Sequence, residues 1–195
     1  MFIVTTFSAL ERLLGFIYRI FLSRTLGSEG MGIYQIALSV VGLIMTLTAS
    51  GIPITVSRIM TKNTAENKEE KNYQTVSAGI FLSAIISLPV LLALMLIPNL
   101  NRLLFQDERS YNVFSVILPG VALTSIYSVL RGFFWGKKQF FTYSLVEFLE
   151  ELVMLIAGVI LINLSTTTAQ KTLASGYAVL ISYVFSFVLA IAIYF

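Results

Sequence analysis

Long runs of apolar residues alternate with short polar or glycine-rich stretches along the whole chain. A helix needs about 20 consecutive apolar residues to cross a bilayer. Six runs reach this length, over residues 4–26, 31–55, 74–97, 112–131, 143–164 and 173–195. Residues 27–30 hold two glycines, and residues 61–72 form the longest polar stretch. The pattern predicts an all-α, polytopic membrane helix bundle with six transmembrane helices, a tight turn at 26–30 and a solvated loop over 61–72.

The composition supports the membrane assignment and argues against several kinds of site. Only 12% of the residues are charged, about half of what a soluble domain carries, and the mean hydropathy is +0.87. The sequence has no cysteine and no histidine, which removes thiolate metal sites and the commonest general base. The net charge of +3 is too small to favour nucleic acid. We therefore expect a multi-pass protein of the cytoplasmic membrane without catalytic residues, metal or cofactor, and with coupling to an ion gradient or the membrane potential left open.

Lysine and arginine are distributed unevenly between the connecting stretches. Seven are assigned to the connections at the ends of the second and fourth runs: Arg58, Lys62, Lys68, Lys71, Arg131, Lys137 and Lys138. Four are assigned to the connections at the ends of the first, third and fifth runs: Arg24, Arg102, Arg109 and Lys171. Cytoplasmic loops carry the excess of these residues in membrane proteins. The distribution predicts that the N-terminus lies in the cytosol.

The last apolar run continues to Phe195 without a polar tail. A helix that ended inside the bilayer would leave its final carbonyl groups without partners. We therefore expect the chain to be a truncated part of a longer protein. The open alternative is a span that ends at the membrane interface.

The first apolar run carries three charged residues, Glu11, Arg12 and Arg19. An ionisable side chain in hydrocarbon costs about 2.5 kcal/mol or more, so such residues face a partner or a water-filled cavity. Arg12 and Arg19 are about two helical turns apart and share one face. This spacing predicts a cationic stripe inside the bundle, where a guanidinium would contact a phosphate or another anion.

The fifth run begins with three acidic residues, Glu147, Glu150 and Glu151. Their spacing places them on overlapping faces of a helix. If the first and fifth runs enter the bilayer from the same side, Arg12 and Glu150 both lie about 10 Å from that surface. We therefore hypothesise an Arg12–Glu150 ion pair, with Glu11, Glu147 and Glu151 as further charge partners. The alternative is that the glutamates lie at the headgroups, where the helix dipole favours acids.

Six short motifs carry a resemblance to one group of membrane exporters. They are LGFIYR at 14–19, SRTLGSEG at 23–30, GIYQ at 32–35, SGIP at 50–53, RGFFWG at 131–136 and EFLEE at 147–151. On these motifs the chain resembles the polysaccharide biosynthesis / stage V sporulation protein B branch of the multidrug/oligosaccharidyl-lipid/polysaccharide (MOP) exporter superfamily. Lipid II flippases and multidrug exporters are relatives of this branch.

The resemblance implies two six-helix lobes arranged as a V around a central cavity, of which residues 1–195 would be the N-terminal lobe. It also implies transport of a lipid-linked, phosphate-bearing saccharide by alternating access. Arg12 stands where the lipid II flippases have a cavity arginine that contacts the diphosphate, and Arg19 stands about one residue from another. The implied partners are membrane lipid, the lipid-linked saccharide, and a C-terminal lobe or a second half-length chain, with no nucleic acid.

Three functions remain open from the sequence. The first is a flippase for a lipid-linked oligosaccharide or a peptidoglycan precursor. The second is a multidrug-type cation antiporter of the same superfamily, in which Glu150 would be the titratable acid. The third is a truncated half-length product that does not transport. An enzyme is the least supported class, because the sequence offers few residues for a nucleophile–base pair.

The truncation hypothesis predicts the size of the native protein. An antibody raised against residues 61–72 should detect, in membranes of the source organism, a protein of about twice the 21.6 kDa of this chain or larger. A band at 21.6 kDa would contradict this expectation. It would leave a dimer of half-length chains or an inactive product.

Overall fold

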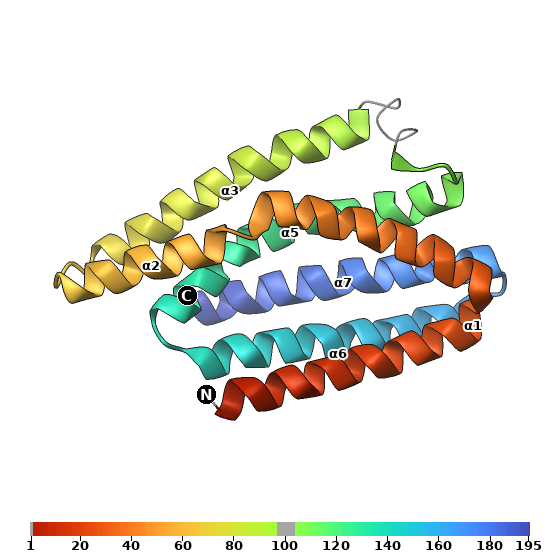
Figure 1. Ribbon diagram of the computed structural model, residues 1–195, viewed down its shortest axis with the longest axis horizontal. Coiled ribbons are helices and arrows are strands. Elements are labelled where there is room, and N and C mark those ends of the chain that lie inside the picture. Colours follow the sequence, from red (N-terminus) through yellow and green to blue (C-terminus); the bar gives the residue numbers. More distant parts are fainter. Residues whose placement is uncertain (1, 97–103) are drawn as a thin grey trace.

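The computed structural model describes residues 2–96 and 104–195, and these residues form a bundle of long helices. An apolar segment in a membrane forms a helix because a helix satisfies the backbone hydrogen bonds of the segment internally. The helices are α1 (Phe2–Ala49), α2 (Ile52–Ala65), α3 (Lys71–Leu96), α5 (Glu108–Gly136), α6 (Phe140–Leu164) and α7 (Thr168–Tyr194) (Figure 1). Three of the predicted runs each lie on one helix or helix arm, whereas the run 31–55 is divided between α1 and α2 at residues 50–51. The run 74–97 lies on α3 as far as Leu96, and the run 173–195 lies on α7 as far as Tyr194.

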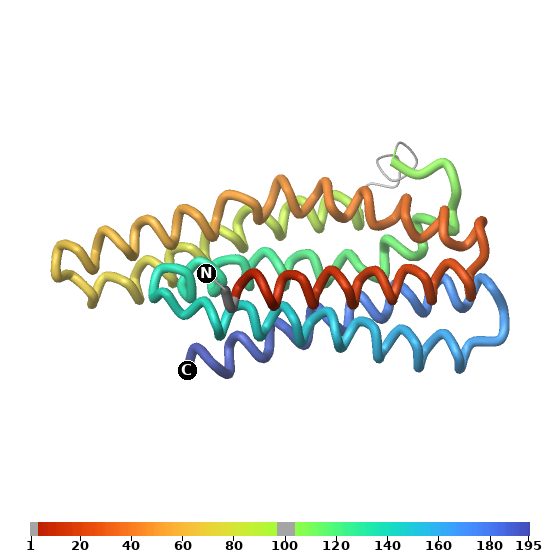
Figure 2. The backbone as a smooth tube through the Cα atoms, turned by 60° about the horizontal axis from the view of Figure 1, so that its bottom comes forward, coloured from red at the N-terminus to blue at the C-terminus, as the bar shows by residue number. Residues whose placement is uncertain are grey.

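Helix α1 consists of two arms that meet at Gly27. This residue has φ 70° and ψ −175°, a conformation that glycine adopts without steric cost. The chain reverses there, so the first arm (residues 2–26) lies beside α6 and the second arm (residues 28–49) returns along the bundle (Figures 1 and 2). The predicted turn at residues 26–30 is confirmed.

The predicted loop over residues 61–72 is wrong for most of its length. Helix α2 continues to Ala65, and α3 already begins at Lys71, so only residues 66–70 connect them. The resulting hairpin extends past the other helices at the N-terminal end of the bundle (Figure 2). Its tip is polar and carries exposed ion pairs from Glu66 to Lys62 and Lys68. The polar residues therefore form helical turns beyond the apolar run rather than a long loop.

Helix α5 is the most buried helix among the candidate membrane spans, because 61% of its most apolar 18-residue stretch is buried inside the bundle. It packs against α7, α2, α1 and α3. Phe114 and Ile117 lie in one hydrophobic core with the first arm of α1, and Leu130 and Phe134 lie in another with α2. The helix is longer at both ends than the predicted span of 112–131. Asp107 caps its start by accepting a hydrogen bond from the backbone N–H of Arg109.

Within residues 2–96 and 104–195, four helical stretches are long and apolar enough to cross a membrane, so the chain is a multi-pass membrane protein. They are Val4–Ala65, Lys71–Leu96, Glu108–Gly136 and Thr168–Tyr194. The first includes both arms of α1 and also α2, and α6 is of similar length but carries three glutamates. Six crossings therefore stay a prediction. Helices α6 and α7 begin at 140 and 168 instead of 143 and 173, and residue 97, the predicted end of the third span, lies outside the described residues.

Close packing of α2 on α5 depends on Gly132. A Cβ atom at this position would lie 2.7 Å from the backbone carbonyl oxygen of Pro53 and 2.8 Å from the Cβ of Val56. We predict that Gly132→Ala lowers the free energy of unfolding by about 1–3 kcal/mol, because backbone atoms would have to move apart. Gly42→Ala is the matched control, since a Cβ there meets no atom within 4 Å. Equal stability of the two variants in detergent unfolding would contradict the prediction.

Candidate functional site

The largest described cavity lies between the two arms of α1, α6 and α7. Its volume is about 890 Å³, within the range of small-molecule sites. The lining combines charged, polar and apolar side chains: Glu11, Arg12, Gly15, Phe16, Tyr18, Arg19, Leu22, Met31, Tyr34, Gln35, Leu38, Ser39, Glu150, Glu151, Met154, Val179 and Tyr183. Such a surface suits a ligand that has both a polar and an apolar part.

Arg12 and Arg19 both line this cavity from the first arm of α1. Both side chains are exposed. Among the residues that the structure describes, neither arginine has an acidic partner within ion-pair distance. The cavity thus contains two guanidinium groups, about two helical turns apart, whose hydrogen-bond donors are available to a ligand.

The Arg12–Glu150 ion pair hypothesised from the sequence does not form in this structure. Glu150 lines the same cavity as Arg12, but no ion pair joins them. Equal depth in the membrane does not determine the direction in which two side chains project from their helices. The structure therefore corrects the pairing while it places both residues in one cavity.

Three carboxylates share the cavity with the arginines: Glu11, Glu150 and Glu151. Glu151 lies against Gly15, because a Cβ at that glycine would be 2.8 Å from the Glu151 carboxylate oxygen Oε1. Gly15 stands three residues after Arg12 and four before Arg19, so this carboxylate approaches the same helical face. The lining is therefore mixed in charge and is not a cationic stripe alone.

Aromatic packing holds the first arm of α1 against α6. The Phe7 ring makes edge contacts with Phe141 and Phe148, at centroid distances of 5.8 and 5.7 Å. Further along the arm, Tyr18 is only 2% exposed and lies directly on Gly158, where a Cβ would be 2.5 Å from the ring. These contacts fix the register between the helix that carries the arginines and the helix that carries Glu150 and Glu151.

Glu147 has a different partner, Arg131, which the sequence analysis assigned to a loop. Arg131 lies inside α5, and its guanidinium forms an ion pair with the Glu147 carboxylate. The guanidinium carbon also lies 5.6 Å from the ring centroid of Tyr127 and 5.4 Å from that of Tyr143. Arg131 therefore no longer counts among the seven loop residues that predicted a cytosolic N-terminus. The sequence signal for its helical position is the Trp-Gly pair at 135–136, which marks the end of the helix after Arg131.

A smaller cavity of about 380 Å³ adjoins the first and shares Glu150 and Tyr183 with it. Its lining also includes Arg131, Tyr127 and Trp135. Glu150 thus stands between two cavities, with two arginines on one side and a third arginine on the other.

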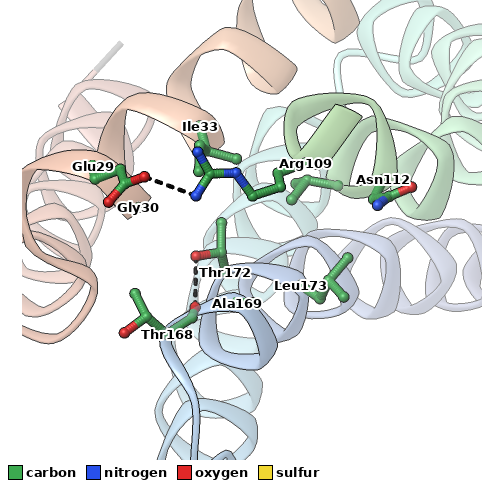
Figure 3. Close-up of a pocket in the computed structure, with 10 residues that line it drawn as sticks. Glu29, Gly30, Ile33, Arg109, Asn112, Thr168, Ala169, Thr172 and Leu173 are labelled. Atoms are coloured by element: carbon green, nitrogen blue, oxygen red, sulfur yellow. Dashed lines mark hydrogen bonds and ion pairs between the residues drawn. The ribbon is translucent and has the colours of Figure 1, made fainter. Parts of the chain in front are cut away.

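A third ion-pair group lies at the far end of the bundle, around a pocket of about 180 Å³ (Figure 3). Arg109 at the start of α5 donates from Nη1 to Glu29, at 2.7 Å, and from Nη2 to Asp107, at 3.1 Å. The hydrogen bonds from Arg109 lower the pKa of Asp107. The Glu29 contact ties the turn after Gly27 to α5, so we read this group as structural support.

Comparisons with known proteins identify the family to which the chain is similar. The family described as polysaccharide biosynthesis protein matches residues 1–195. Stage V sporulation protein B of Bacillus subtilis (strain 168) is 30% identical over 143 residues, which are 73% of this chain and 28% of that protein. The lipid II flippase MurJ of the same organism is 24% identical over 189 residues, 91% of this chain and 35% of MurJ. The chain therefore spans about a third of the length of these relatives. No solved structure matches it significantly.

The Arg131–Glu147 pair should stabilise the fold. The two side chains are 32% and 19% exposed, so we expect Glu147→Gln or Arg131→Gln to lower the free energy of unfolding by about 2 kcal/mol, below the roughly 3–5 kcal/mol of a fully buried pair. The charge-swapped double variant should recover part of this loss. Lys62→Gln breaks an exposed pair and should change stability by less than about 1 kcal/mol. The free energies of unfolding are measured in detergent. If the swapped variant loses as much stability as the two single variants together, the prediction is contradicted.

Proposed function

This chain belongs to the polysaccharide biosynthesis protein family, and we propose that it is the N-terminal lobe of a membrane transporter that moves a lipid-linked oligosaccharide or peptidoglycan precursor across the cytoplasmic membrane. The observation that carries this proposal is the position of Arg12 and Arg19 in one cavity, where no acidic group of the described residues lies within ion-pair distance of either guanidinium. Transport would proceed by alternating access of that cavity to the two sides of the membrane.

The chemistry of the two arginines fits a phosphate-bearing head group. A guanidinium presents several N–H donors in a planar fork and binds phosphate through paired, charge-assisted hydrogen bonds. Arg12 and Arg19 are about 10 Å apart along their helix, so one head group would contact both only if it is extended. Gln35 and Ser39 on the second arm of α1 add uncharged polar groups for the hydroxyls of a sugar.

The rest of the proposal concerns what completes the transporter. We propose a C-terminal lobe, or a second copy of this chain, as the other wall of the cavity, and a cytosolic N-terminus as the charge distribution predicts. An ion gradient or the membrane potential would drive the change between inward and outward access. Lipid II, an exopolysaccharide unit and a spore-cortex precursor all present the required combination of phosphate, sugar and lipid.

A second candidate function is supported by a specific observation, the presence of Glu11, Glu150 and Glu151 in the same cavity. Carboxylates attract cations, and a multidrug-type cation antiporter would use one of them to exchange a proton or metal cation for its substrate. The two candidates differ in which charged residues contact the substrate. A chain that does not transport remains the third alternative, and the same assay addresses it.

The test is a transport assay with the intact protein in liposomes that contain a lipid-linked saccharide. We expect Arg12→Gln and Arg19→Gln each to reduce substrate binding about 10- to 100-fold, because a hydrogen bond between charged partners contributes about 1.5–3 kcal/mol. The transport rate at low substrate concentration should fall in proportion. Arg58→Gln is the matched control, since Arg58 is exposed on α2 and lines none of the cavities described above.

Two outcomes would overturn the flippase proposal. If both arginine variants transport the saccharide like the wild type, the guanidinium groups do not bind the head group. If the wild type moves a lipophilic cation but no lipid-linked saccharide, and Glu150→Gln stops this movement, the antiporter is supported instead. Absence of transport for both substrate classes by a correctly inserted protein would favour the third alternative.

A further inference from the structure

A groove of about 680 Å³ lies on another part of the bundle, between α3 on one side and α2 with the end of α1 on the other. It shares no lining residue with the cavity of Arg12 and Arg19. Helix α3 packs on α2 but diverges from the second arm of α1 as it leaves the hairpin (Figure 1). The groove opens where the two helices separate.

Each wall of the groove is one helical face that changes from polar to apolar along its length. The α3 wall is formed at intervals of three or four residues by Lys71, Gln74, Ala78, Leu82 and Ile86. Such intervals keep side chains on the same face of a helix. The groove therefore follows α3 continuously from the hairpin toward the middle of the bundle.

The opposite wall runs in the reverse direction, from Asn63 near the end of α2 to Leu47 in α1. A hydrogen bond of 3.3 Å from Asn63 to Thr75 joins the polar ends of the two walls. At the other end, Leu47 and Leu82 are 73% and 54% exposed. In a multi-pass membrane protein, exposed leucines at this depth contact lipid chains.

Lys71 supplies a positive charge at the polar end that is not held in an ion pair within 4.0 Å by any described residue, although it is close enough to Glu66 to lower the pKa of that carboxyl. Lys62 and Lys68 of the same hairpin form ion pairs with Glu66, and Lys137 forms one with Glu69. Within the described part of the chain, no acidic group lies within ion-pair distance of Lys71. The groove thus begins with the Lys71 ammonium group and the Gln74 amide, which suit an anionic head group.

The length of the groove matches one membrane leaflet. From Lys71 to Ile86 the helix rises about 22 Å. Half of the hydrocarbon core is about 15 Å thick, and the headgroup region adds roughly 5–7 Å on each side. A phospholipid whose phosphate lies at Lys71 would therefore place the end of its acyl chain near Ile86. A long polyprenyl chain would extend beyond this length.

We propose that this groove binds one anionic phospholipid from the leaflet at the hairpin end of the bundle. Its phosphate contacts Lys71 and the amide group of Gln74, and one acyl chain lies between Leu82 and Leu47. This proposal does not depend on the transported substrate, because the groove and the arginine cavity are separate.

The test is native mass spectrometry of the intact protein in mild detergent, titrated with phosphatidylglycerol, phosphatidylcholine and undecaprenyl phosphate. We expect one tightly retained phosphatidylglycerol. Ala78→Phe, which fills the groove from α3, should weaken its binding at least tenfold. Lys71→Gln should reduce the preference for phosphatidylglycerol over phosphatidylcholine about fivefold, the effect of one basic side chain at an anionic membrane surface.

Matched variants separate groove filling from general damage. Ser77→Phe adds the same ring at the neighbouring exposed position, which does not line the groove, and should bind lipid like the wild type. Lys68→Gln removes a paired lysine and should keep the preference. Gly51→Leu fills the groove from the other wall, where a Cβ meets no atom within 4 Å. It provides a second groove-filling variant if Ala78→Phe does not fold.

Two results would overturn the proposal. One is wild-type phosphatidylglycerol binding in both Ala78→Phe and Gly51→Leu. The other is displacement of phosphatidylglycerol by a lower concentration of undecaprenyl phosphate, which would assign the groove to a polyprenyl lipid. Loss of saccharide transport in the Arg12 and Arg19 variants with unchanged lipid binding would keep the two proposals distinct.

Discussion

The arrangement of this bundle depends on how it accommodates charge inside apolar helices. A charged side chain surrounded by hydrocarbon is unstable, so each one has to meet an opposite charge, an aromatic face or water. Arg131 and Glu147 follow the first two routes, between Tyr127 and Tyr143. Arg12 and Arg19 follow the third, in a cavity where no acidic group of the described residues lies within ion-pair distance of them. Paired charges hold the fold together, and unpaired charges mark surfaces that are open to a ligand.

Small residues make this separation possible. Gly132 brings α2 onto α5, and Gly158 receives the ring of Tyr18, so the helices approach closely at these two residues. Gly15 leaves room for the Glu151 carboxylate beside the two arginines. The cavity and the groove occur where helices diverge instead, between the arms of α1 and between α1 and α3. The helices thus pack closely at Gly132 and Gly158, and the cavity and the groove lie where helices diverge.

The sequence was sufficient to predict the all-α membrane fold, the turn at Gly27 and the helical positions of Arg12 and Arg19. Hydropathy reports the length of apolar runs, and a helix continues past an apolar run wherever its polar turns meet water favourably. For this reason residues 61–65 were assigned to a loop although they lie in a helix. Arg131 was assigned to a loop as well, because hydropathy does not show that its charge is paired with Glu147 inside the bundle. The Arg12–Glu150 pair failed for another reason: depth follows from residue number, but the direction of a side chain depends on packing against neighbouring helices.

Arg12 and Arg19 are carried by one uninterrupted stretch of helix, and this has a consequence for selectivity. The distance between their points of attachment, about 10 Å, is set by the rise of the helix and stays constant when the helix tilts, shifts or rotates as a unit. In the proposed transporter, a ligand that contacts both arginines would need acceptor groups at a matching separation. Conformational change would alter which side of the membrane the two arginines face, while the distance between their points of attachment remains the same.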